Sequence, residues 1–202
     1  MSFKPEWTLY RQGKDAERIL IGEQSPERVK NQEGHVDYLP FRSVMEIVRR
    51  IQENFKQPYD PAQPSLRYPL AYWLHRYLSE ALAARGGAVK FFTAVNSILD
   101  LRHGVDGFID YQTPEGLLVT VPLDLTLNES KFAGGTHGHF IVPATEAMME
   151  SSEVVREQSK AISKDLLMKL ADQEKELTAR MRPSYQPYQP TRHLRRRPAQ
   201  AA

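Results

Sequence analysis

Two apolar stretches rich in β-branched residues lie near the middle of the chain, with a short turn between them. The first covers residues 104–111 and the second residues 117–127. Residues 113–116, Thr-Pro-Glu-Gly, have the composition of a tight turn. This pattern predicts a β-hairpin, around which the other predicted elements are arranged.

Further segments carry helical or strand patterns on either side of the hairpin. Residues 41–56 and 69–85 have apolar side chains at helical spacing, and two glycines follow the second segment. Residues 89–95 predict a strand and residues 140–142 a short one. The order predicts a mixed α/β (α+β) fold: a small central mixed sheet with a hairpin, flanked by helices, and a long C-terminal helix.

The two ends of the chain differ from this core, which spans residues 41–143. Residues 1–40 are interrupted by glycines and prolines and predict an irregular segment, with a short strand at residues 19–21. Residues 144–182 predict a long charged helix. Residues 183–202 are rich in Pro, Gln and Arg, which predicts a disordered tail.

The long charged helix has two interpretations. Met148, Val155 and Ile162 are seven residues apart, and leucines continue the apolar stripe. About 36 residues would extend ~54 Å, so the helix could protrude and pair with a second copy of the chain as a homo-oligomer. In the other interpretation the helix breaks near Ser151 or Ser163 and both pieces fold onto the core.

Charge is unevenly distributed along the chain. The net charge is +2, and six arginines without any acid lie after residue 176. Residues 1–176 hold the other 21 basic and all 25 acidic residues, a net charge of −4. This asymmetry predicts a polyanionic partner for the tail, with nucleic acid bound by Arg192, Arg195, Arg196 and Arg197. A solubilising appendage is the alternative.

Composition also excludes several classes of protein. The chain has no cysteine, which excludes disulfides and zinc sites built on thiolates. It has no apolar stretch of signal-peptide type at its start and none near the ~20 residues that span a bilayer. We therefore expect a soluble, cytoplasmic protein without a membrane partner.

Each strand of the predicted hairpin carries a carboxylate among apolar neighbours, Asp106 in the first and Asp124 in the second. Burying a carboxylate costs free energy unless a cation or hydrogen bonds compensate. Two carboxylates on adjacent strands can point into one cleft, where oxygen ligands suit Mg²⁺, with Mn²⁺ as a substitute. In the structural alternative, Asp106 shapes the end of its strand and Asp124 hydrogen-bonds a neighbouring threonine.

This order of elements and acids resembles the core of the PD-(D/E)xK nuclease superfamily, over roughly residues 66–142. The resemblance implies a metal-dependent phosphodiester hydrolase in which Asp106 and Asp124 bind the metal. It also implies that Glu80, on the helix before the sheet, assists. No proline precedes Asp106, and Thr126 takes the place of the family's catalytic lysine.

Threonine cannot supply the positive charge that a lysine places beside a scissile phosphate. Lys131 and Lys90 are the candidates to replace it. The sequence therefore predicts a divergent nuclease-like protein that acts on or binds nucleic acid, with impaired catalysis. The alternative is a non-enzymatic interaction or assembly protein that uses the long helix and the basic tail.

Three histidines form a second, weaker candidate site. His137 and His139 are two residues apart, and His103 is close to Asp106 in the sequence. Alternate residues of a strand point to one face, so the pair could bind a transition metal. The glycines around His137 instead favour a loop in which the pair is incidental.

Overall fold

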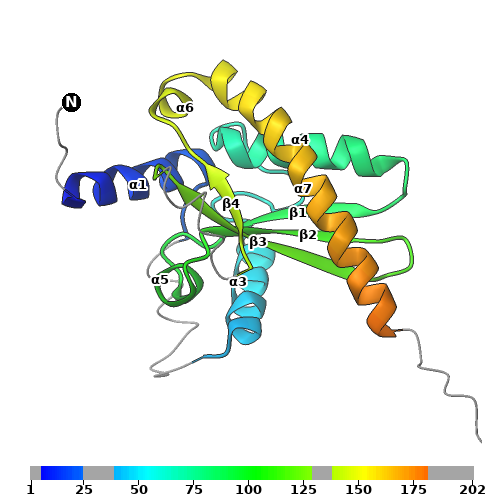
Figure 1. Cartoon of the computed structure of the whole chain (residues 1–202). Coiled ribbons are helices and arrows are strands. Elements are labelled where there is room, and N and C mark those ends of the chain that lie inside the picture. The colour runs from blue at the N-terminus through cyan, green and yellow to red at the C-terminus, as the bar shows by residue number, and fades with distance from the viewer. Residues whose placement is uncertain (1–5, 25–38, 129–137, 182–202) are drawn as a thin grey trace, which may run out of the picture.

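The computed structural model describes residues 6–24, 39–128 and 138–181 (Figure 1), and the side chains of residues 6–11 are not described. The elements occur in the order α1 (Glu6–Ile21), α3 (Phe41–Phe55), α4 (Pro69–Ala83), β1 (Ala88–Thr93), α5 (Ile98–His103), β2 (Gly107–Gln112), β3 (Leu118–Thr126), β4 (Phe140–Pro143), α6 (Glu146–Glu150) and α7 (Ser152–Met181). The predicted mixed α+β class with a long C-terminal helix is confirmed.

The four strands form one sheet in the order β1-β2-β3-β4. β1, β2 and β3 are antiparallel neighbours, whereas β4 is parallel to β3. The predicted hairpin is β2–β3, and its turn is closed by hydrogen bonds from Thr113 N to Leu117 O and from Gly116 N to Thr113 O, both 2.9 Å. Gly116 has a φ of +84°, a conformation that glycine adopts without strain.

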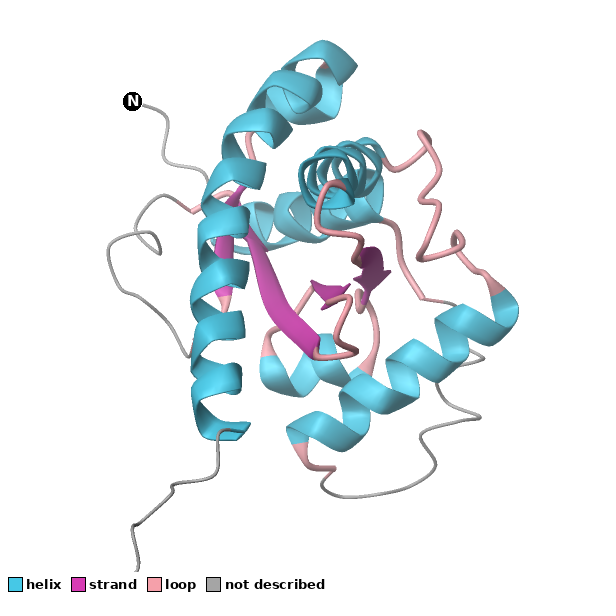
Figure 2. Ribbon diagram, turned by 90° about the vertical axis from the view of Figure 1, so that its right-hand side faces the viewer, coloured by secondary structure: helices cyan, strands magenta, loops and turns pink. Residues whose placement is uncertain are grey.

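Helices cover both faces of the sheet (Figure 2). Alternate residues of a strand point to opposite faces, so each strand supplies apolar side chains to two cores. The smaller core packs α3 and α5 against Phe92 and Phe108. The larger core packs α1, α4 and α7 against residues that include Phe91, Ile109 and Val121.

Residues 6–21 form helix α1, so the prediction of an irregular segment with a short strand was wrong for this part of the chain. Ala16, Leu20 and Ile21 are buried in the larger core. The charged residues Lys14 and Glu17 also lie on the inward side, and they obscure the apolar spacing. Gly13 lies inside the helix, where a glycine costs only ~1 kcal/mol relative to alanine.

The segment before β2 also differs from the prediction. Residues 98–103 form the short helix α5. Ser97 caps this helix by accepting hydrogen bonds from the amides of Leu99 and Asp100. β2 begins at Gly107, so Asp106 lies immediately before the strand instead of inside it.

The C-terminal helical region is broken at Ser151, one of the two predicted positions. Thr145 caps α6, and the extended backbone of Ser151 separates α6 from α7. Ser151 Oγ then accepts a hydrogen bond from Val154 N at 3.4 Å. α7 is buried along one side by residues that include Val155, Ile162 and Leu166. Both pieces therefore fold onto the core, and pairing with a second copy stays a prediction.

α7 packs against α4 and β3, and its C-terminal end lies beside the β2–β3 turn (Figure 1). Its length and polarity fit a surface helix. Within the described ranges, none of the helices is both long and apolar enough for a membrane span.

Candidate functional site

Asp106 lies at the end of the sheet where β2 begins. Its backbone N–H donates to Leu123 O at 2.9 Å, and its side-chain Oδ2 accepts a hydrogen bond from Leu125 N at 2.7 Å. Gly107 pairs with Leu123, so Asp106 and Asp124 are next in line on the two strands. The hairpin thus holds the backbone of both aspartates at the same end of the sheet.

Two further carboxylates approach Asp106 from helices. α1 supplies Glu17, and the first turn of α5 supplies Asp100. Glu17, Asp100 and Asp106 are 7%, 7% and 4% exposed, and one oxygen of each lies within 4.8 Å of those of the other two. We name these three residues the carboxylate cluster. Among the described residues, this is the one group of three or more potential metal ligands.

Lys14 is the cation of the carboxylate cluster. Its Nζ donates to Glu17 Oε2 at 2.6 Å and to the two oxygens of Asp100 at 2.8 and 3.0 Å. It lies 3.8 Å from Asp106 Oδ1. Lys14 and Glu17 are three residues apart on α1, a spacing that places both on one side of a helix.

The pKa values show that one lysine does not neutralise three carboxylates. Burial raises the pKa of Glu17 to about 7, against the opposing hydrogen bond and charge of Lys14. The negative charges of Asp100 and Asp124 raise the pKa of Glu17 further. Burial, followed by the charges of Glu17 and Asp100, raises the pKa of Asp106 well above its usual range. The carboxyl of Glu17 therefore retains a proton up to about neutral pH.

The pKa of Lys14 is raised, although burial by itself lowers the pKa of a lysine. Burial alone would lower it, but the hydrogen bonds to Asp100 and Glu17, with the charges of both carboxylates, raise it above the usual lysine value. Lys14 is consequently fully protonated. It acts in the folded chain as a fixed positive charge and not as a base.

Asp124 belongs to the surroundings of the cluster. It lies half-buried on β3, and its charge acts on Glu17 as described above. The structure thus brings Asp106 and Asp124 to one end of the sheet. Of the two aspartates named from the sequence, Asp106 belongs to the carboxylate cluster, and Asp124 lies outside it.

The structure does not bring Glu80 to this group. Glu80 is exposed on α4, where its carboxylate accepts a hydrogen bond from Arg76 Nε at 2.8 Å. The helix acid beside Asp106 is Glu17 of α1. The prediction chose α4 because it is the helix immediately before β1, whereas the helical character of α1 was not recognised.

The predicted replacements for the motif lysine have different positions. Lys90 Nζ donates to Glu53 Oε1 at 2.6 Å on the α3 side of the sheet, away from the cluster. Lys131 lies outside the described residues. Thr126 is buried, and its Oγ1 accepts a hydrogen bond from Asn128 N at 3.1 Å. The lysine that contacts the carboxylate cluster is Lys14, which the sequence patterns did not indicate.

Two of the three candidate histidines contact the ring of Phe41. The His103 ring meets Phe41 edge-on at 5.4 Å between centroids, and the His139 ring stacks on it at 6.1 Å. Neither belongs to the carboxylate cluster. His137 and the tail residues Arg192, Arg195, Arg196 and Arg197 lie outside the described part of the chain.

A second buried aspartate shows how a purely structural carboxylate is satisfied here. Arg49 donates from Nε to Asp110 Oδ2 at 2.7 Å and from Nη2 to Oδ1 at 2.9 Å. Thr120 Oγ1 adds a hydrogen bond to Asp110 Oδ1 at 2.6 Å. Two acids, Asp110 and the exposed Glu46, contact Arg49, whereas the carboxylate cluster shares one lysine among three buried acids.

Comparison with known proteins gives no relative. The chain significantly matches no protein-family model, no curated protein and no solved structure.

Proposed function

We propose that the chain is a divergent metal-dependent nuclease-like protein, in which the carboxylate cluster and Asp124 bind Mg²⁺, or Mn²⁺ as a substitute. The observation that carries this proposal is the excess of buried carboxylates over cations beside Asp106. Hard divalent cations prefer such oxygen ligands. The acids converge from α1, from α5, from the residue before β2 and from β3. Asp100 also accepts a hydrogen bond from Asn96 N at 2.8 Å.

The raised pKa values in the carboxylate cluster support the binding of a divalent cation, whose charge exceeds that of lysine. Glu17 and Asp106 hold protons above their usual pKa because their negative charges are buried together. A divalent cation would satisfy the same carboxylates without protons. Its binding should therefore release protons near neutral pH, and affinity should rise with pH.

Bound Mg²⁺ would supply water activation and charge neutralisation for phosphodiester hydrolysis. Glu17, Asp100 and Asp106 would hold the ion, with Asp124 nearby. Lys14 supplies the fixed positive charge that Thr126 cannot supply, and it would face a phosphate beside the ion. Because this lysine comes from α1 and not from β3, we propose weak or absent nuclease activity on the bound nucleic acid.

One observation favours a second candidate, a non-enzymatic protein that keeps this fold for binding or assembly. The ammonium of Lys14 already makes close contacts with Glu17 and Asp100. In that case the lysine stabilises the acids permanently, and no divalent cation enters.

Calorimetric titration of the full chain with MgCl₂ and MnCl₂ separates the two candidates. We expect one saturable site with proton uptake by the buffer. Glu17→Gln and Asp106→Asn should weaken it about tenfold or more, and Glu80→Gln, an exposed acid on α4, is the matched control. Absence of binding at millimolar metal, or equal affinity in all three variants, would favour the second candidate.

Cleavage of labelled single- and double-stranded DNA tests the chemistry separately. We expect slow cleavage that needs Mn²⁺ or Mg²⁺ and disappears in Asp106→Asn. Lys14→Gln should lower the rate by about 100-fold or more if Lys14 stabilises the transition state. Metal binding without cleavage would place the protein among nucleases that have kept the site but lost the reaction.

A further inference from the structure

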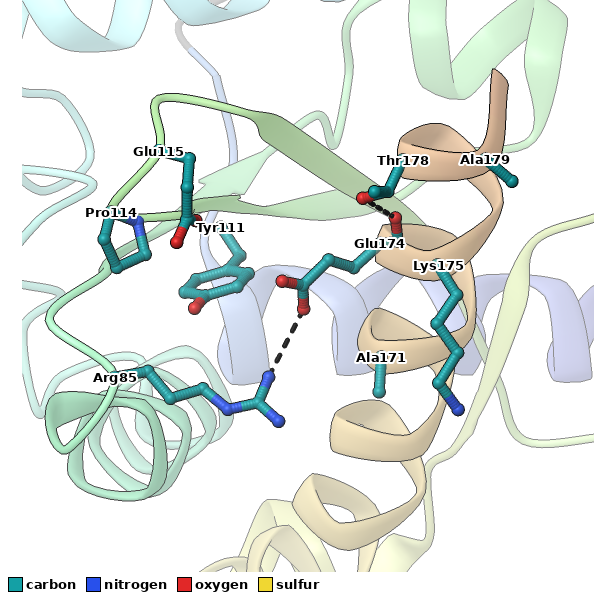
Figure 3. Close-up of a pocket in the computed structure, with 9 residues that line it drawn as sticks. All are labelled: Arg85, Tyr111, Pro114, Glu115, Ala171, Glu174, Lys175, Thr178 and Ala179. Atoms are coloured by element: carbon teal, nitrogen blue, oxygen red, sulfur yellow. Dashed lines mark hydrogen bonds and ion pairs between the residues drawn. The ribbon is translucent and has the colours of Figure 1, made fainter. Parts of the chain in front are cut away.

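A hollow of about 620 Å³ lies between the end of α4, the β2–β3 turn and the C-terminal half of α7. It opens near the far end of β2 from Asp106, about five residues or ~17 Å along the strand. Its volume lies within the range of small-molecule sites, ~300–1,000 Å³. Figure 3 shows Arg85, Tyr111 and Glu174 converging on it from three different elements. We name it the α4–α7 hollow.

Tyr111 provides a buried polar group in the wall of the hollow. The residue is 1% exposed, and its ring packs so closely on Gly87 that an added Cβ there would lie 2.3 Å from it. Its hydroxyl has no hydrogen-bond partner among the described residues. A buried hydroxyl without a partner costs free energy. A phenylalanine would fill the same space without that cost.

Arg85 provides a positive charge that an incoming ligand can use. Its guanidinium Nη1 lies 3.3 Å from Glu174 Oε2, its one ion pair among the described residues (Figure 3). The side chains of Arg85 and Glu174 are 57% and 28% exposed. An exposed, single-contact pair of this kind contributes little to stability. The contact therefore shows that Arg85 can bind a carboxylate. Because the pair is weak, a ligand's carboxylate could replace that of Glu174.

The rest of the hollow limits the ligand by size and charge. Pro114 and Ala171 give it small apolar walls, and Glu115 and Lys175 lie at its rim. With Arg85 and Glu174 included, the lining has two positive and two negative groups. This balance disfavours a polyanion and suits a ligand with one negative charge.

We propose that the α4–α7 hollow binds a small organic carboxylate. The ligand's oxygens take the place of Glu174 on Arg85 and accept a hydrogen bond from the Tyr111 hydroxyl, and its apolar part lies against Pro114 and Ala171. This site is separate from the carboxylate cluster and does not depend on the proposed metal.

Saturation-transfer NMR on the full chain tests this with sodium benzoate as the probe. Benzyl alcohol is the uncharged match and inorganic phosphate the competing anion. We expect saturable benzoate binding that Tyr111→Phe and Arg85→Gln weaken about fivefold or more. Arg76→Gln is the control, because Arg76 forms a comparable exposed ion pair on α4, outside the hollow.

Tyr111→Phe keeps the ring, so lost binding cannot be assigned to a collapsed wall if the variant unfolds at or above the wild-type temperature. Absence of saturable binding, or equal benzoate binding in Arg85→Gln, would overturn the proposal. If benzyl alcohol bound as tightly as benzoate, the hollow would recognise only the apolar part of the ligand, and the proposal would be wrong. Phosphate displacing benzoate at equal concentration would contradict the preference for one charge.

Discussion

The ammonium of Lys14 lies 2.8 Å from one carboxylate oxygen of Asp100 and 3.0 Å from the other. These residues are 86 positions apart in the chain. The contact joins α1 to α5, beside the point where β2 begins. A charged contact therefore fixes the position of α1 at the same end of the sheet that carries Asp106 and Asp124.

Stability should depend on pH through Glu17. The pKa of its carboxyl is raised from 4.5 to about 7 in the folded chain, so between these values the folded state keeps a proton that the unfolded chain releases. The free energy of unfolding should fall as pH rises through this window and then level off. The loss is on the order of 1 to 3 kcal/mol.

Urea unfolding of the wild type and Glu17→Gln, between about pH 5 and about pH 8, measures this contribution as a difference. Glutamine cannot ionise, so the variant should gain relative stability as pH rises. Glu80→Gln should follow the wild type, since Glu80 is exposed. Parallel curves for the wild type and Glu17→Gln would contradict the raised pKa.

Removing Lys14 should destabilise the chain because it leaves several buried carboxylates without their cation. For Lys14→Met we expect a loss of about 2 to 4 kcal/mol near pH 8. The loss should be smaller near pH 5, where Glu17 is protonated. If the cluster binds metal, millimolar Mg²⁺ should recover much of the loss. Thermal unfolding with and without Mg²⁺ at both pH values is the measurement.

Two buried tyrosines should respond in opposite directions to removal of their hydroxyl groups. Tyr59 Oη donates to Ile21 O at 2.9 Å, so Tyr59→Phe leaves that buried carbonyl without this bond and should cost about 1 kcal/mol. Tyr111→Phe removes an unpartnered hydroxyl and should be neutral or stabilise by up to about 1 kcal/mol. Urea unfolding of both variants checks this. A comparable loss in Tyr111→Phe would reveal a hydrogen bond at its hydroxyl.

The elements with unmixed patterns were predictable from the sequence. The helix at residues 41–55 and the hairpin of residues 107–126 bury apolar side chains at their expected spacing. α1 was not predictable in this way, because it buries Glu17 beside apolar residues. The charged residues on the inward face of α1 are explained only by the tertiary fold, which places Asp100 and Asp106 beside them.

The candidate site was predicted in part for the same reason. Asp106 and Asp124 stand out because carboxylates are rare within apolar strands. Glu17, Asp100 and Lys14 lie in polar surroundings in the sequence, where charged residues are ordinary, and only the tertiary fold brings them to Asp106. A signal was nevertheless present, since Lys14 and Glu17 are spaced for one side of a helix.

The last prediction concerns the basic tail after α7. Arginine-rich, acid-free segments bind nucleic acid through phosphates, and Tyr185 and Tyr188 could stack on unpaired bases. If all six arginines after residue 176 contact phosphates of a single strand, log affinity should fall with log salt at a slope of up to about −4. A truncation after Met181, where α7 ends, should bind more weakly and with a shallower slope. Fluorescence anisotropy with labelled oligonucleotides at several salt concentrations measures both quantities. Equal slopes for the two chains would assign any binding to the folded core and leave the tail a solubilising appendage.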